Sequence, residues 1–446
     1  MLQIQKKLTN SFYAVLALPA TAMGFALCIQ ISALSWILST KYDLAIEEIG
    51  LVWASGPLAG LVMQLVVGLL SDNAWFWGGR RRPFILIGGT IAALMLICLP
   101  NLDKIQILFG AASLIPIALC VATTLDLAIN LGFNPTRSII TDVTPDGKAR
   151  TKGYTWMQTV SGTFGVLAYF IGAELGNYTL IYAGVFIVLA FSIIPVFFIK
   201  EPRILTASSP AASGHGELHT LDEMTMDVNA IETNASTPKA EINELIKIYF
   251  ANAFSWIGVQ TMFVFMFAYA SQILFHTNDS ASLNDSQNNE IGRIISYSFL
   301  ILNAVGAFLP ALLLEPLTRK YGRINVQSTC ILFMSLAYLL IIFYGTSAIA
   351  LYLFMALAGV GWAAIVSLPF AIMSEKVNKQ RMGLFMGIFN MSIVIPQLVV
   401  SLMISHFVAD AENKRIIFEI SAVSLFLSFV MWRLVKEKSK SKTADL

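Results

Sequence analysis

The chain has 446 residues, of which 57% are hydrophobic and 13% are charged. Its mean hydropathy of +0.71 lies far above that of soluble domains and excludes a water-soluble globular protein. The formal net charge of +2 is too small to indicate nucleic-acid binding. The lipid bilayer is therefore the expected main solvent of this chain.

Long apolar stretches recur along the sequence, and each approaches or exceeds the roughly 20 residues that a helix needs to cross a hydrocarbon core. The first lacks a small-residue cleavage site followed by a soluble domain, so we expect it to be a retained span. We predict about twelve transmembrane helices, at 12–39, 46–71, 83–101, 106–141, 150–176, 179–199, 243–275, 291–317, 323–345, 347–374, 382–407 and 414–435.

Six predicted spans precede one long polar segment and six follow it. Residues 206–239 carry side chains too small and polar to bury a core. The two histidines in this segment have no third metal ligand nearby, so no metal site is expected. The predicted organisation is a six-helix bundle at 1–200, a flexible cytoplasmic linker at 201–241, and a second six-helix bundle with a short basic tail at 242–446.

The distribution of charge predicts the orientation of the spans. Basic residues collect in alternate connections, as at Arg80 to Arg82 and in the tail from Lys436 to Lys442, whereas Asp279 to Glu290 is acidic and polar. This pattern follows the positive-inside rule. It places both termini in the cytoplasm of a multi-pass protein, which we expect in the cell (inner) membrane.

Two connections repeat one spacing. The chain after the second span reads GLLSDNAWFWGGRRRP and the chain after the eighth reads EPLTRKYGR, with an acid seven residues before a Gly-Arg pair in both. Two related halves around a midplane site are typical of transporters. We predict that charged groups in these loops and at the end of span four form gates that switch between states, although the arginines have an alternative role in enforcing topology. The predicted gating residues are Asp72, Arg80, Arg81, Asp142, Glu315, Arg319 and Arg323.

The fourth span holds a stripe of polar residues. Asp126, Asn130, Asn134 and Arg137 fall within an arc of about 80° on one helix face. A buried charge costs at least roughly 2.5 to 3.5 kcal/mol at the membrane centre, which favours a functional role over a structural one. Eleven residues separate the two charges, about 16 Å along the helix, so they do not form a direct ion pair.

The two charged groups of this stripe suit different tasks. Asp126 lies about midway through the span, where a carboxyl group can load and release a proton and, when protonated, donate a hydrogen bond. Arg137 stays charged and is suited to holding polar oxygens of a substrate. The alternative is that both bond to polar groups of neighbouring spans and are structural.

Further amides and indoles in the spans suit a sugar, because amides bind pairs of hydroxyl groups and aromatic rings pack on sugar C–H surfaces. Any one amide also serves as a contact between helices. The chain shows no nucleophilic triad, phosphate loop or metal cluster, so we expect neither an enzyme nor a cofactor. The predicted substrate-binding residues are Arg137, Asn130, Asn134, Gln30, Gln158, Trp256, Gln260, Asn390 and Gln397.

Several segments resemble the major facilitator superfamily, and within it the branch of plant sucrose/proton symporters with their animal and bacterial relatives, similar to glycoside-pentoside-hexuronide sugar transporters. The resemblance extends over nearly the whole chain, and the Asp followed after six residues by GRRRPF is its most specific element. The matching segments are 53–72, GRRRPF at 79–84, LDLAIN at 125–130 continuing to Asp142, EPLTRK at 315–320, SLPF at 367–370 and GIFNMSIVIPQ at 387–397.

The resemblance implies an all-α major facilitator fold of two six-helix bundles and proton-driven uptake of a glucoside such as sucrose or maltose. It implies that Asp126 is the proton-coupling acid and that Arg137 is the transport-essential arginine. One departure concerns span seven, where plant members carry an acidic Phe-Asp-Thr-Asp segment and this chain has FMFAYA at 265–270. The residues on the second half of the site are therefore expected to differ.

We thus predict a monomeric proton-coupled sugar symporter, with a proton rather than sodium as the coupling ion, and the lipid bilayer as its surroundings. Two alternatives stay open. One is proton-driven export of an amphiphile, which would favour a greasier cavity. The other is a non-transporting membrane sugar sensor that signals through the linker.

Overall fold

The computed structural model describes residues 3–73, 75–145, 148–201, 239–277, 283–309, 313–374, 376 and 382–436. Within these ranges the regular structure is helical, and one isolated antiparallel bridge joins Phe76 and Gly79. Most of the predicted linker lies outside the described residues. The side chains of Asp72, Asn134 and Glu315 also lie outside them.

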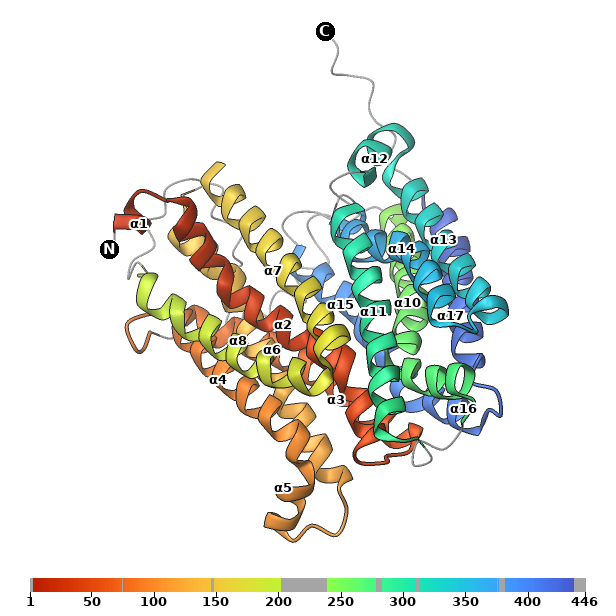
Figure 1. Ribbon diagram of the computed structural model, residues 1–446. Helices are drawn as coiled ribbons and strands as arrows, with labels where there is room; N and C mark the ends of the chain where they lie inside the picture. Colours follow the sequence, from red (N-terminus) through yellow and green to blue (C-terminus); the bar gives the residue numbers. More distant parts are fainter. Residues whose placement is uncertain are drawn as a thin grey trace.

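The first half begins with the short helix α1, and its long helices follow in antiparallel order (Figure 1). The helices are α1 (Gln3–Lys6), α2 (Asn10–Thr40), α3 (Ile46–Asn73), α4 (Arg82–Cys98) with the 3₁₀ turn η1 (Leu99–Asn101), α5 (Leu102–Phe109), α6 (Ile115–Val143), α7 (Lys148–Leu175) and α8 (Asn177–Phe198).

The second half repeats this arrangement, and two of its spans contain a π-helical turn, a feature that is frequent at functional sites. The helices are α10 (Lys239–Tyr269) with η2 (Ala270–Leu274), α11 (Asp285–Leu309), α12 (Glu315–Tyr321), α13 (Arg323–Tyr344), α14 (Ala348–Ser374), α15 (Met382–Val399) with η6 (Val400–Ile404), α16 (Ser405–Asp410) and α17 (Ile416–Arg433).

Ten helical segments of the described chain are long and apolar enough to cross a membrane. Two further helices of 28 residues, α3 and α7, run among them. The predicted all-α membrane fold with about twelve spans is therefore confirmed. The domain boundaries at 200 and 242 stay a prediction.

The predicted boundary between the third and fourth spans was wrong. Residues 102–109 continue the third span as α5, and the fourth begins only at Ile115. Gly110 takes the left-handed conformation with φ of 61° and ends α5, while Pro116 occupies the first turn of α6. The prediction followed the apolar run through 106–114 and overlooked these two signals.

The eighth span begins earlier than its prediction at 291–317. Helix α11 begins at Asp285 and is described to Leu309, and the predicted end of the span is not tested because residues 310–312 lie outside the described residues. Its first turns carry the polar sequence DSQNNE, which periodicity of apolar residues does not detect. The helix therefore starts about two turns before the first apolar residue.

Each half has its own packing. In the first, α2 packs against α7 and α8, and α6 packs against α3 and α4. In the second, α10 and α13 both pack against α17, and α14 packs against α11 and α13. One hydrophobic core runs through both halves, because a large cluster of buried residues includes Phe25 of α2, Tyr169 of α7 and Phe299 of α11.

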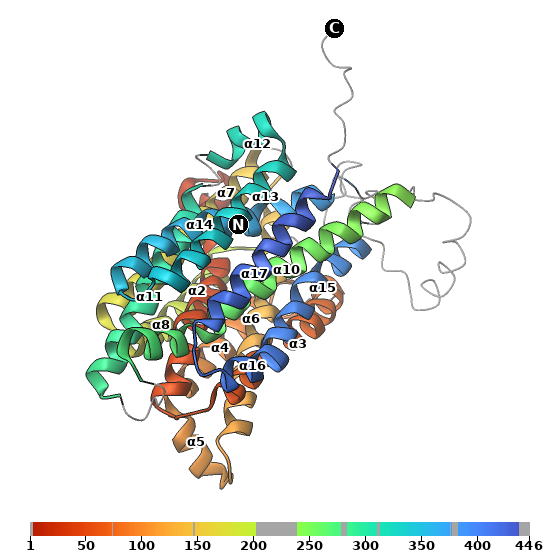
Figure 2. The same ribbon diagram turned by 90° about the vertical axis from the view of Figure 1, so that its right-hand side faces the viewer.

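The halves meet at one end of the molecule. We call the end with residues 3, 201, 239 and 436 the linker end and the opposite end the hairpin end. Helices α7 and α11 contact each other near the hairpin end and diverge toward the linker end (Figure 1). The same end brings α3 against η6 and α16, and Figure 2 shows α3, α15 and α16 on one side of the molecule.

Hydrogen bonds join the halves near the hairpin end. The Trp36 indole donates to the Asn288 carbonyl at 2.7 Å, and Ser35 donates to the Val264 carbonyl at 2.9 Å. The hydroxyls of Ser32 and Ser296 lie 2.9 Å apart. This conformer is therefore held together at the hairpin end.

We expect Gly89→Ala to destabilise the first half, because a Cβ at this position of α4 would overlap with the Ser192 side chain of α8. Overpacking of this kind costs roughly 1 to 3 kcal/mol. Thermal unfolding in detergent measures the loss. The matched control is Gly162→Ala on α7, whose added methyl meets no atom within 4 Å; equal unfolding midpoints for the two variants would contradict the packing described.

Candidate functional site

The Asp126 carboxyl group lies inside the first half, with only 5% of the residue exposed. The Gln30 amide of α2 donates to both of its oxygens, at 3.0 Å each. The Ser55 hydroxyl of α3 lies 3.5 Å from Oδ2 and donates a shorter bond of 2.7 Å to the Val52 carbonyl. Three helices therefore enclose this acid, and the partners that they offer are uncharged.

Two glycines of α3 make room for the polar stripe of α6. A Cβ on Gly56 would stand 2.9 Å from Asp126 Oδ2, so a larger residue would press on the carboxyl group. One turn later, Gly60 faces the Asn130 amide at ordinary contact distance, and that amide donates to the Asp126 carbonyl at 2.9 Å. The sequence SGPLAG thus shapes the wall against which Asp126 packs.

Arg137 and Asp126 have separate surroundings, as the helical rise predicts. The Arg137 side chain is exposed and its guanidinium lies 5.8 Å from the centre of the Phe133 ring. Tyr154 of α7 donates to the Arg137 carbonyl at 3.3 Å, and Gln158, one turn further along α7, is also exposed. An exposed guanidinium and an exposed amide are costly against hydrocarbon, so we expect this face of α6 and α7 to meet water.

The second half contributes indoles and amides. The Trp362 indole of α14 donates to the Asn303 side chain of α11 at 3.1 Å and packs edge-on against Trp256 of α10. The Gln397 amide of α15 donates to Gln260 of α10 at 3.3 Å.

Asn390 is partly buried on α15. Among the described residues, the Asp126 carboxyl group takes its hydrogen bonds from α2 and α3, and not from Gln260, Asn390 or Gln397. In this conformer the predicted substrate residues therefore form two groups, one in each half, which we call the two walls of the site.

A row of aromatic rings connects the two walls. Trp362 packs against Phe263 with ring centres 5.5 Å apart, Phe263 against Phe299 at 5.3 Å, and Phe299 against Tyr169 of α7 at 6.0 Å. The Tyr169 hydroxyl lies beside the Cys28 thiol of α2. The sequence analysis missed Tyr169, since one tyrosine in an apolar span carries no signal of its position.

The charged loop after α3 is bound within its own half. Arg80 Nη2 lies 2.9 Å from Asp142 Oδ2 at the end of α6, and Arg81 Nε lies 3.3 Å from the same oxygen. The Glu201 carboxylate accepts the backbone N–H groups of Arg80, Arg81 and Arg82 at 2.7 to 2.8 Å. These three groups lie directly before and at the start of helix α4, where a negative charge is favoured.

Glu201 was missed in the sequence analysis. The sequence does show an acidic residue directly after the sixth span. It does not show that folding brings this residue next to the basic loop after α3. A Cβ on Gly79 would stand 2.7 Å from Glu201 Oε1, so the glycine permits this approach. The loop therefore depends on a glycine, a carboxylate and helix α4 together.

The corresponding loop of the second half has a different backbone. Helix α12 ends at Tyr321, and Gly322, with φ of 83°, leads directly into α13. In the first half the chain turns at Gly78, with φ of 74°, and α4 begins only at Arg82. The shared spacing therefore does not produce one shared local structure. Arg319 is exposed and Arg323 is partly buried at this loop.

About twelve membrane helices in two halves with a buried carboxyl group define a polytopic membrane protein of the transporter type. The family model described as Major Facilitator Superfamily matches residues 16–401, with a second match at 304–445. The chain belongs to the Major Facilitator Superfamily, and it is an integral multi-pass membrane protein.

Curated relatives cover most of the chain. It is 25% identical over 433 residues to "Sucrose transport protein SUC4" of Arabidopsis thaliana, covering 86% of this chain and 81% of that protein. It is 25% identical over 437 residues to "Sucrose transport protein SUT2" of Oryza sativa subsp. indica, covering 86% and 84%. These relatives agree with the predicted branch of the superfamily.

Solved structures share the fold. The nucleoside transporter NupG has a TM-score of 0.63 at 14% identity, covering 96% of this chain and 100% of that one. The inward open conformation of the xylose transporter XylE from E. coli has a TM-score of 0.67 at 14% identity, covering 97% of each chain. At this identity the likeness shows the fold alone.

We expect Glu201→Gln to loosen the loop after α3, because the neutral amide loses the charge that three backbone N–H groups bind. Charge-assisted hydrogen bonds of this kind stabilise by roughly 1 to 3 kcal/mol. The unfolding midpoint in detergent should fall accordingly. Glu290→Gln removes an exposed carboxylate paired three residues on with Arg293 and is the control, with an expected loss below about 1 kcal/mol; a Glu201 variant as stable as this control would contradict the role of the carboxylate.

Proposed function

We propose that this protein is a secondary active transporter that takes up a sugar, a disaccharide or other glucoside, together with a proton by alternating access. The observation that carries the proposal is the Asp126 carboxyl group, 5% exposed and held by Gln30 and Ser55. An acid so enclosed, with neutral partners among the described residues, is suited to binding and releasing a proton. The names of the curated relatives support a sugar as the co-transported solute.

Protonation supplies the coupling in this mechanism. An ionised Asp126 accepts the Gln30 amide at both of its oxygens and, with Ser55, links α2, α3 and α6. A protonated carboxyl group has a hydroxyl to donate, so it exchanges one of these bonds for a bond to another acceptor such as a sugar oxygen. Binding of sugar and binding of a proton then favour each other.

The other proposed sugar contacts come from both halves. Arg137 and Gln158 offer exposed donors on α6 and α7. Trp256 and Trp362 offer aromatic surfaces on α10 and α14, where sugar C–H groups pack. Closure of the two walls onto one solute then unites the residues that this conformer keeps apart.

The alternation follows from the seam between the halves. The positive-inside pattern assigns the linker end to the cytoplasm, so the conformer described, held at its hairpin end, corresponds to an inward-open state. Entry from outside then requires release of the Trp36, Ser35 and Ser32 bonds. Arg80, Arg81 and Asp142 are proposed to change partners when the linker end closes.

The first test is counterflow in proteoliposomes with labelled sucrose, maltose, trehalose and glucose. We expect a glucosyl disaccharide to accumulate transiently against its unlabelled form, because exchange requires only the binding site and alternation. A thermal-shift panel of sugars and amphiphiles accompanies it. Stabilisation by amphiphiles with no sugar exchanged would support an exporter instead, and sugar binding without exchange would support a sensor.

The second test separates coupling from binding at Asp126. Asp126→Asn keeps the shape and removes the titrating group, so accumulation driven by an imposed pH gradient should fall at least about tenfold. The sugar that gives counterflow in the unmodified protein should still exchange in the variant, which is the internal control. Accumulation at the unmutated level would remove Asp126 from the coupling role.

The membrane potential sets the scale of the driving force in that assay. One charge crossing 100 mV contributes about 2.3 kcal/mol, which corresponds to a roughly fiftyfold gradient of solute. A potential imposed without a pH gradient should therefore also drive uptake in the unmodified protein. The same potential should leave Asp126→Asn at equilibrium exchange.

A further inference from the structure

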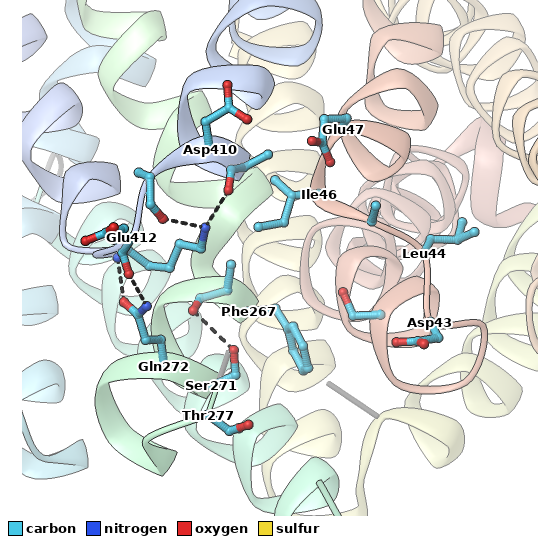
Figure 3. A pocket seen from close by; sticks show the side chains of 16 residues that line it. Asp43, Leu44, Ile46, Glu47, Phe267, Ser271, Gln272, Thr277, Asp410 and Glu412 are labelled. Carbon is cyan, nitrogen blue, oxygen red and sulfur yellow. Dashed lines mark hydrogen bonds between the residues drawn. The ribbon is translucent and has the colours of Figure 1, made fainter. Parts of the chain in front are cut away.

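A cavity lies at the hairpin end, where its lining residue Ser39 is nine residues along α2 from Gln30. It has a volume of about 490 Å³ and is bounded by residues of both halves (Figure 3). The first half contributes the α2–α3 connection around Asp43 and Glu47. The second half contributes Phe267 and Gln272 of the seventh span and the α16–α17 connection.

The lining of this cavity is strongly acidic. Asp43, Glu47, Asp410 and Glu412 all line it, and Lys414 is the one basic residue among its lining residues. Figure 3 shows Glu47 and Asp43 on one side of the space and Asp410 and Glu412 on the other. The formal charge of the lining is therefore three negative.

The hydrogen bonds of the Lys414 ammonium group are made to the protein's own backbone. Its ammonium group donates to the carbonyls of Val408, Ala409 and Ala411 at 2.8 to 3.0 Å, and the residue is 9% exposed. Burial lowers the pKa of this ammonium group, and the carboxylates of Glu47 and Asp410 oppose that shift. The lysine thus satisfies carbonyl groups at the end of α16. Its single positive charge is smaller than the negative charge of the four lining carboxylates.

An independent feature points to a ligand in this space. The Ser39 hydroxyl lines the cavity, is 7% exposed, and has no hydrogen-bond partner in the described part of the chain. Gln272, another lining residue, is held in place, since it donates to the Glu412 carbonyl at 2.6 Å and accepts the Lys414 N–H at 2.5 Å. A hydroxyl on a largely buried side chain that lines a cavity without a protein partner favours a polar ligand in that cavity.

The hydrogen-bonding groups and the charge of the lining indicate which class of ligand it binds. Carboxylates accept hydrogen bonds only, so the ligand must be rich in donors. Within the described residues, no three His, Cys, Asp or Glu side chains converge as metal ligands do, which argues against a bound metal ion. Phe267 adds an aromatic ring to the wall, a surface that attracts organic cations.

We propose that this cavity binds an organic polycation of the linear polyamine class. Two or three ammonium groups on one flexible chain match the excess of negative charge on the lining and supply the donors that the carboxylates accept. The apolar methylene segments pack against Phe267 and Ile46. A neutral polyhydroxy compound satisfies the hydrogen bonds but leaves the excess of charge in place.

Binding there has a consequence for conformation. The ligand contacts Glu47 of the first half and Asp410 and Glu412 of the second, so it bridges the seam that must open at the hairpin end. A ligand that binds one conformer better shifts the population toward it. The polycation is therefore a stabiliser of the conformer described here and an inhibitor of any cycle that opens this end.

The test is binding of spermidine and putrescine to the full-length protein in detergent, followed by thermal unfolding and titration calorimetry. We expect spermidine to raise the unfolding midpoint and to bind more tightly than putrescine. The neutral 1,8-octanediol, and magnesium chloride at equal ionic strength, should not reproduce the shift. Equal shifts with octanediol or magnesium would overturn the proposal.

Matched variants locate the effect. The triple variant Glu47→Gln, Asp410→Asn, Glu412→Gln should weaken spermidine binding at least about tenfold. Ser39→Leu fills the cavity without changing charge and should weaken it as well. Glu419→Gln removes an exposed carboxylate at the same end outside the cavity and should leave binding unchanged. Unchanged affinity in both the triple variant and Ser39→Leu would overturn the site, whatever the protein transports.

Discussion

The cost of holding a carboxyl group inside a membrane protein organises the first half. Asp126 needs hydrogen-bond donors at both oxygens and a wall without side chains, and these come from Gln30 on α2 and from Ser55 and Gly56 on α3. The glycine matters as much as the amide, because a Cβ there would occupy the space of the carboxyl group. Three helices thus meet at one carboxyl group. A change in its protonation would alter hydrogen bonds that contribute to the packing of all three.

The seam between the halves is built differently. It depends on single hydrogen bonds, such as Trp36 to the Asn288 carbonyl, and on close approach at Gly50, where an added Cβ would stand 2.5 Å from the Ser401 carbonyl oxygen. Hydrogen bonds between membrane helices average only about 0.6 kcal/mol each. A contact made of several weak bonds between small residues holds a conformer and still opens without great cost, whereas the cores of the halves persist.

Helical periodicity and hydropathy were enough to predict the fold and the separate placement of Asp126 and Arg137, because both follow from rise and rotation along one helix. Gln30 was predicted as a substrate contact, yet its pairing with Asp126 depends on how α2 packs against α6, which no spacing encodes. Glu201 was missed for the same reason, since it reaches Arg80 only across the fold. The error at residues 102–114 was local, and Gly110 and Pro116 carried the signal needed to avoid it.

The buried carboxyl group lies in the first half and the paired indoles lie in the second, so the coupling proposed for this protein would have to pass between the halves. The row of rings from Trp362 through Phe263 and Phe299 ends at Tyr169, whose hydroxyl lies beside Cys28 on α2. Cys28 precedes Gln30 by two residues on α2, so a shift of α2 that follows the state of Asp126 also moves the thiol against which Tyr169, the last ring of the row, lies. Under the proposed function, a solute held against the indoles and a proton held on Asp126 would both act through α2, because Cys28 and Gln30 lie on that helix, and no direct contact between solute and proton would be required.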